Sequence, residues 1–136
     1  MKADPQQRIL IIDDDIDAIA MLQTVLEHNG YGVISALNGK NGLSMARRDK
    51  PDLIVLDVMM PDVSGYEVCG LIKTDPDTVN IPVIMLTGRD MGEDVDMAIK
   101  KRADWFVVKP YDISYLMSKI NAFLKPKKPA TPHEHI

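Results

Sequence analysis

This sequence has little material for disulfide bonding or membrane insertion. Its 136 residues include one cysteine, Cys69, which cannot form an internal disulfide, so a reducing compartment is expected. No apolar run approaches the roughly 18 residues that a membrane-spanning helix needs. The apolar stretch near the N-terminus is too short for a secretory signal, because it is followed by an acidic residue, Asp13. These absences predict a cytoplasmic protein without a membrane partner.

The excess of negative over positive charge is also small. The net charge is −4, so no excess of positive charge is available for direct binding of nucleic acid or an anionic membrane. The charged fraction of 26% and the hydrophobic fraction of 46% are typical of a globular protein. The length is that of one domain with one core.

Short apolar runs predict the strands. Four of them are rich in β-branched residues and lack polar alternation, which is typical of strands buried on both faces of a parallel sheet. A weaker run, Tyr31–Ala36, contains glycine and serine and predicts an edge strand. The four strong runs are Ile9–Ile12, Leu53–Leu56, Val83–Leu86 and Val107–Val108, the last preceded by Trp105 and Phe106.

Apolar residues three or four positions apart predict helices between these strands. The first helix follows Asp15, a residue type preferred at helix N-caps, and stops at Gly30. Strand and helix alternate five times, which predicts an α/β fold with a doubly wound five-stranded parallel sheet. The other helices are expected over Gly39 to Asp49, around Val68, Leu71 and Ile72, around Val95, Ala98 and Ile99, and from Ile113 to Leu124 after Asp112.

Each strong apolar run stops at a polar side chain. The four ends are Asp13 with Asp14, then Asp57, Thr87 and Lys109. Right-handed crossovers make these strands parallel, so their carboxyl ends share one edge of the sheet, where α/β proteins bind ligands. One such residue is often only a cap for the next turn. The four ends together predict a site with three carboxylates, a hydroxyl and an ammonium.

These groups fit phosphoryl transfer to a carboxylate. Three clustered carboxylates repel one another unless a cation is present, and Mg²⁺ binds carboxylates, carbonyls, waters and phosphate oxygens. A carboxylate can attack phosphorus and hold the group as an aspartyl phosphate. Such transfer needs mainly positioning and neutralisation of the phosphoryl oxygens, which the cation, Lys109 and Thr87 would supply.

Four segments resemble the CheY-like receiver domains of two-component response regulators. The resemblance covers about residues 7–124 and implies a flavodoxin-like (βα)5 fold with strand order 2-1-3-4-5. It places a receiver domain at 1–124, and residues 125–136, rich in lysine and proline, are expected to be disordered. The segments are Ile9–Asp15 (ILIIDDD), Leu53–Gly65 (LIVLDVMMPDVSG), Val83–Gly88 (VIMLTG) and Phe106–Pro110 (FVVKP).

The resemblance assigns the metal site. Asp57 is implied to be the phosphoacceptor, and Asp14 a direct ligand of Mg²⁺. Asp13 is implied to orient the metal through water. Met59 is implied to bind it through the backbone carbonyl, which leaves the methionine side chain free to vary.

The resemblance also assigns the switch residues. Thr87 is implied to bind the phosphoryl group and report its arrival, and Lys109 to pair with Asp57 before phosphorylation and with a phosphoryl oxygen afterwards. Phe106 matches the switch aromatic, and Pro110 follows a peptide bond that is typically cis in this family. The expected output surface comprises the fourth helix, the fifth strand and the fifth helix.

The implied partners are a sensor histidine kinase or phosphotransfer protein and an unidentified downstream protein. The expected state is a monomer or a weak phosphorylation-dependent dimer. Met59 and Arg89, two residues after Asp57 and Thr87, predict slow hydrolysis of the phosphoryl group because methionine cannot position a water by hydrogen bonding.

Two positions depart from the family pattern. Arg102 replaces the glycine common before Ala103 and Asp104. Trp105 stands where DNA-binding regulators often carry an acidic residue, which disfavours their salt-bridged dimer. Trp105 either packs on the fifth helix near Tyr115 or serves as an anchor for a partner.

Two other functions remain open from the sequence. The first is a phosphatase of the haloacid-dehalogenase type, since Asp13 and Asp15 are spaced like its nucleophile motif. Asp17 is then an unusual neighbour, the chain is short, and Asp57 has no role. The second is a binding module that has lost phosphorylation, although every chemical position is filled.

Overall fold

The computed structural model describes residues 7–88 and 102–124, and it confirms the predicted fold class. The five strands are all parallel and follow the order β2-β1-β3-β4-β5. The elements are β1 (Arg8–Ile12), α1 (Ile16–His28), β2 (Gly32–Ala36), α2 (Gly39–Asp49), β3 (Leu53–Asp57), α3 (Gly65–Thr74), β4 (Val83–Thr87), β5 (Trp105–Val108) and α5 (Ile113–Leu124).

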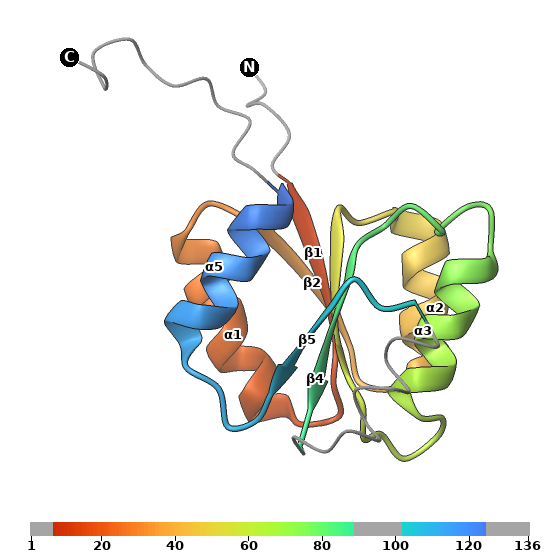
Figure 1. Cartoon of the computed structure of the whole chain (residues 1–136), viewed down its shortest axis with the longest axis horizontal. Coiled ribbons are helices and arrows are strands. Elements are labelled where there is room, and N and C mark those ends of the chain that lie inside the picture. The colour runs from red at the N-terminus through yellow and green to blue at the C-terminus, as the bar shows by residue number, and fades with distance from the viewer. Residues whose placement is uncertain (1–6, 89–101, 125–136) are drawn as a thin grey trace, which may run out of the picture.

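Helices cover the two faces of the sheet separately, with α1 and α5 on one face and α2 and α3 on the other (Figure 1). Alternate residues of β1 supply the two halves of the core. Ile9 and Ile11 pack with α1 and α5, whereas Leu10 and Ile12 pack with the cluster that includes residues of α2 and α3. All four side chains are at most 1% exposed. The absence of polar alternation in the sequence therefore reflects a sheet buried on both sides.

Polar side chains and backbone turns delimit the helices as expected. The carboxylate of Asp15 caps α1 by accepting hydrogen bonds from the backbone N–H groups of Asp17 and Ala18. Gly30, with a φ of 92°, follows the end of this helix in the left-handed region that glycine adopts readily. The N-terminal boundary of α1 therefore follows from local sequence.

The two aromatic residues of β5 stack with ring centroids 6.1 Å apart, but they contact different elements. Phe106 packs against the core cluster on the α2 and α3 side. Trp105 lies toward α5, where its Nε1 donates a hydrogen bond to the Tyr115 hydroxyl at 3.3 Å and the Lys119 ammonium lies 4.4 Å from the ring centroid. Packing of Trp105 near Tyr115 is thus confirmed, and the indole remains 38% exposed.

An ion pair joins α3 to the strands at the edge of the sheet opposite the predicted site. Lys73 Nζ lies 2.7 Å from Asp104 Oδ2 and also donates to the carbonyl of Ile81 at 2.7 Å. Asp104 Oδ2 accepts a further hydrogen bond from the backbone N–H of Val83, the first residue of β4. Each charged group is therefore satisfied by more than one partner.

Several predictions fall outside the described residues. These are the fourth helix around Val95, Ala98 and Ile99, the role of Arg89, and the terminal segment 125–136. Over residues 7–88 and 102–124, no helix has the length and apolar character to cross a bilayer.

Candidate metal and phosphoacceptor site

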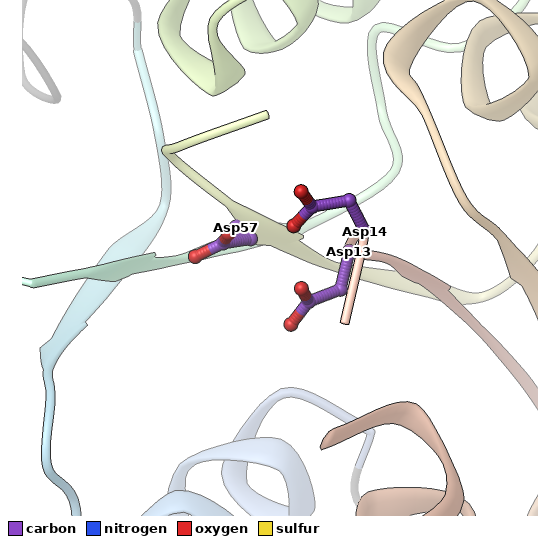
Figure 2. Close-up of side chains that lie close together, drawn as sticks. All are labelled: Asp13, Asp14 and Asp57. Atoms are coloured by element: carbon purple, nitrogen blue, oxygen red, sulfur yellow. The ribbon is translucent and has the colours of Figure 1, made fainter. Parts of the chain in front are cut away.

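The sheet brings Asp13, Asp14 and Asp57 together. β1 and β3 are hydrogen-bonded neighbours, with Ile12 paired to Leu56, so the residues that follow these positions end side by side. One carboxylate oxygen from each aspartate lies within 4.8 Å of the others. Figure 2 shows Asp13 and Asp14 leaving the end of β1 beside Asp57 at the end of β3.

The three aspartates differ in burial. Asp13 and Asp57 are each only 4% exposed, whereas Asp14 is exposed to solvent. Asp13 is oriented by the backbone, because its Oδ1 accepts a hydrogen bond from the N–H of Asp15 at 3.0 Å. The cluster therefore combines two buried carboxylates with one that solvent can reach.

Lys109 completes the cluster from the end of β5. Its Nζ lies 2.7 Å from Asp57 Oδ1. The backbone N–H of Lys109 donates to the carbonyl of Thr87 at 2.7 Å, which fixes the lysine beside the end of β4. The Lys109–Pro110 peptide bond is cis, as the resemblance implied.

The electrostatics of the buried carboxylates favour uptake of a cation. Burial raises the pKa of Asp57 above its ordinary value, and the hydrogen bond and charge of the Lys109 ammonium only partly offset this effect, with a smaller rise from Asp14. Burial likewise raises the pKa of Asp13, helped by Asp57 and Asp14 and opposed by the hydrogen bond from Asp15. The negative charge gathered here therefore exceeds what Lys109 neutralises.

The same carboxylates also shift the pKa of Lys109. Burial alone would lower the pKa of its ammonium, but the hydrogen bond and charge of Asp57, with the nearby Asp13, outweigh burial and raise it. Lys109 therefore remains charged at neutral pH.

The donor set suits a divalent cation bound by oxygen. Asp13, Asp14 and Asp57 offer hard carboxylate oxygens on two sides of a small space, which matches the preference of Mg²⁺. Met59 lies two residues beyond Asp57 and lines a cleft of about 470 Å³ together with Asp14. Met59 is 70% exposed.

Thr87 lies beside the cluster, and Phe106 lies further back along β5. Thr87 ends β4 and is 3% exposed, and β3 is the hydrogen-bonded neighbour of β4. Phe106 is half-buried and pairs in register with Met85 of β4. All the residues that the sequence singled out for the site thus lie at or near one edge of the sheet.

Three residues near the site were not singled out by the sequence. Tyr111 shares a cleft of about 470 Å³ with Asp13 and Lys109, and burial, opposed by Lys109, raises the pKa of its phenol. Gly65 lies against the backbone of Asp57, because a Cβ there would collide with the Asp57 carbonyl oxygen. Asp62 binds the start of α2. Asp62 and Gly65 stand in the segment Leu53–Gly65 that carries the family resemblance, but neither of them was assigned a role from the sequence.

The haloacid-dehalogenase alternative is not supported at this site. That alternative pairs Asp13 with Asp15, but the carboxylate of Asp15 is used to cap α1. The partner of Asp13 in the cluster is Asp57, which that alternative leaves without a role.

Comparison with known proteins identifies a family. Residues 9–121 match the family described as "Response regulator receiver domain". The protein PilH of Pseudomonas aeruginosa is 36% identical over 117 residues, which cover 86% of this chain and 97% of PilH. The alkaline phosphatase synthesis transcriptional regulatory protein PhoP of Bacillus subtilis is 36% identical over 93% of this chain. The chain spans only about half the length of PhoP, 52%.

A solved structure agrees. The chemotaxis protein CheY4 of Vibrio cholerae superposes with a TM-score of 0.82 at 26% identity, covering 88% of this chain and 99% of that one. Receiver domains act in signalling as phosphoacceptors rather than as conventional enzymes. The match also excludes the phosphatase alternative at the level of family. This chain therefore belongs to the response regulator receiver domain family of two-component signal transduction.

Proposed function

We propose that Asp57 accepts a phosphoryl group from a sensor histidine kinase or phosphotransfer protein, in a reaction that requires Mg²⁺. The observation that carries this proposal is the cluster of Asp13, Asp14 and Asp57 with Lys109 paired to Asp57 at 2.7 Å. The cluster concentrates more negative charge than Lys109 neutralises. A carboxylate nucleophile in such a place needs a cation to bring in an anionic phosphoryl donor.

Different residues would bind the ion directly and through water. Asp14, exposed at the mouth of the cluster, binds it directly, together with Asp57 and the backbone carbonyl of Met59. Asp13, held by the N–H of Asp15, orients it through water. When bound, Mg²⁺ neutralises the carboxylates and the equatorial phosphoryl oxygens.

The transfer is a displacement at phosphorus. An oxygen of the Asp57 carboxylate forms a bond to phosphorus as the bond from phosphorus to the donor imidazole nitrogen breaks. The electron pair of that bond stays on the imidazole. Lys109 moves its ammonium from Asp57 to a phosphoryl oxygen, and the Thr87 hydroxyl donates to another.

The signal then leaves through residues next to Thr87. Movement of Thr87 toward the phosphoryl group opens space for Phe106, which is half-buried before the change. Trp105 and Tyr115 lie exposed on the neighbouring surface of β5 and α5, where they can anchor a downstream protein.

Intact-mass analysis after treatment with acetyl phosphate and Mg²⁺ tests the proposal. The expected result is a gain of one phosphoryl group in the wild type and none in Asp57→Asn or in EDTA. Asp52→Asn is the matched control, because Asp52 lies just before the other end of β3 and should leave labelling unchanged. Labelling of Asp57→Asn would contradict the assignment. Absence of labelling in the wild type would favour the binding module without phosphorylation.

A further inference from the structure

The loop from Asp57 to α3 carries part of the proposed metal site. It is closed at its two ends by backbone hydrogen bonds. The N–H of Val58 donates to the carbonyl of Leu86 at 3.0 Å, and the N–H of Gly65 donates to the carbonyl of Val58 at 2.8 Å. Met59 lies between these fixed points, and its side chain and that of Pro61 are exposed. Between them, Met60 is half-buried and packs against the core cluster on the α2 and α3 side, so an apolar contact holds this part of the loop, and a polar anchor comes from a further residue.

Asp62 provides that anchor by binding the start of α2. Its Oδ1 accepts a hydrogen bond from the N–H of Gly39 at 3.1 Å, and its Oδ2 accepts one from the N–H of Lys40 at 3.1 Å. The next N–H, of Asn41, is bound by the N-cap side chain of Asn38. Residue 62 thus satisfies two helix donors that the helix cannot satisfy itself.

The charge of Asp62 suits this position. The N-terminus of a helix carries partial positive charge and favours an anion. The hydrogen bonds from Gly39 and Lys40 lower the pKa of Asp62, so the carboxylate stays ionised at neutral pH and both oxygens remain acceptors.

Packing reinforces the tether. A Cβ added to Gly39 would lie 2.5 Å from Val63 Cγ2 and 2.8 Å from Val68 Cγ2, so the helix start and the loop are in direct contact. A larger residue at position 39 would require the side chains of Val63 and Val68 to shift. The polar tether of Asp62 and the apolar contact of Val63 therefore act on the same short segment.

We propose that Asp62 is a positioning residue that holds the loop against α2 and thereby fixes the backbone of Met59 at the metal site. The inference rests on the proposed binding of Mg²⁺. It extends that site to a residue that does not touch the ion, and it links the ion to the N-terminus of α2.

Titration of Mg²⁺ by calorimetry tests the proposal with Asp62→Ala and Asp62→Asn. Loss of a residue that orients a ligand typically weakens metal binding by tenfold or more, so Asp62→Ala is expected to raise the Kd for Mg²⁺ about tenfold. Asp62→Asn keeps one acceptor oxygen and should fall between wild type and Asp62→Ala. Asp75→Ala is the control, since Asp75 also contacts α2, through an ion pair with Arg47 at 2.7 Å, but lies just beyond the far end of α3.

A spectroscopic reading separates positioning from stability. Addition of Mg²⁺ should shift the amide resonances of Gly39 and Lys40 in the wild type, and Asp62→Ala should lose this coupling at a temperature where it is fully folded. If Asp62→Ala does not fold, Gly39→Ala replaces it and should also weaken Mg²⁺ binding. Unchanged Mg²⁺ affinity in the folded variants would overturn the inference alone. Absence of Mg²⁺ binding by the wild type would overturn the proposed function as well.

Discussion

Two lysine–aspartate ion pairs lie at opposite ends of the same sheet and differ in how they are balanced. Lys73 and Asp104 are 2.7 Å apart, as are Lys109 and Asp57. At the first end, Lys73 has a carbonyl as a second acceptor and Asp104 has a backbone N–H as a second donor. At the other end, in the described part of the chain, Lys109 faces a cluster of three carboxylates.

The comparison distinguishes an ion pair that stabilises the fold from an ion pair whose groups can take part in a reaction. A pair with every hydrogen-bonding group satisfied holds α3 and the starts of β4 and β5 in place. A pair with surplus negative charge can exchange its partner for a cation or a phosphoryl group. Distance alone does not distinguish them, so the neighbours of each pair decide its role.

Removal of the lysines should give the largest difference. Lys73→Met leaves Asp104 without its counterion and is expected to lower the free energy of unfolding by about 2 kcal/mol, less than the usual cost of breaking a fully buried pair because the side chain of Asp104 is 34% exposed. Mg²⁺ should not change this loss. Lys109→Met should instead lose stability that Mg²⁺ restores, because the ion replaces the missing positive charge. Urea denaturation with and without Mg²⁺ measures both effects. Equal responses to Mg²⁺ would remove the distinction between the two ends.

The carboxylate cluster should make stability fall with rising pH. The pKa values of Asp13 and Asp57 are raised above 3.8, so the folded protein holds these protons more tightly than the unfolded chain. The stabilisation is complete below about pH 3.8 and is lost as the pH rises through the folded pKa values.

Asp13→Asn should therefore reduce this pH dependence. At neutral pH in EDTA, the substitution is expected to raise the free energy of unfolding by on the order of 1 kcal/mol, since it removes the cost of burying a charged carboxylate and the smaller repulsion from Asp57 and Asp14. The amide that replaces the carboxylate would still offer an oxygen to the N–H of Asp15. Urea denaturation over a pH series is the measurement, with Asp52→Asn as the control. A larger stabilisation by Asp52→Asn would contradict the inference that the carboxylate cluster destabilises the folded protein at neutral pH.

The smallest effect should come from Arg102, which lies two residues before Asp104. Its φ of 66° is in the left-handed region, where a side chain is unfavourable and glycine is not. Arg102→Gly is expected to raise the free energy of unfolding by about 0.5 kcal/mol, because the relief of left-handed strain is partly offset by the conformational entropy that glycine loses. Arg102→Ala keeps the Cβ and should have little effect in the same thermal or urea experiment. If both variants behave alike, the side chain of Arg102 matters rather than its backbone.

The sequence predicts the strands and the chemical residues of this protein well, because both follow from local patterns. Buried parallel strands are apolar throughout, and Asp13, Asp57, Thr87 and Lys109 stand where those runs stop. The departure at Arg102 was also visible, although its φ angle was not.

The missed residues depend on contacts between distant segments. Asp62 binds α2 across 23 positions of sequence, and Lys73 finds Asp104 only after β4 and β5 have paired. Gly65 is needed because α3 approaches the Asp57 carbonyl, a distance set by packing. Periodicity and residue type do not encode such contacts, so they emerge only from the folded arrangement.

The register between β1 and β3 has a consequence for how the native pairing is selected. With Ile12 opposite Leu56, the aspartates that follow end together. A slip of one residue would turn the side chains of one strand to the opposite face and separate the carboxylates. An ion held at the proposed site by both strand ends would bind only correctly paired chains, so by mass action it would favour the native register over any shifted one.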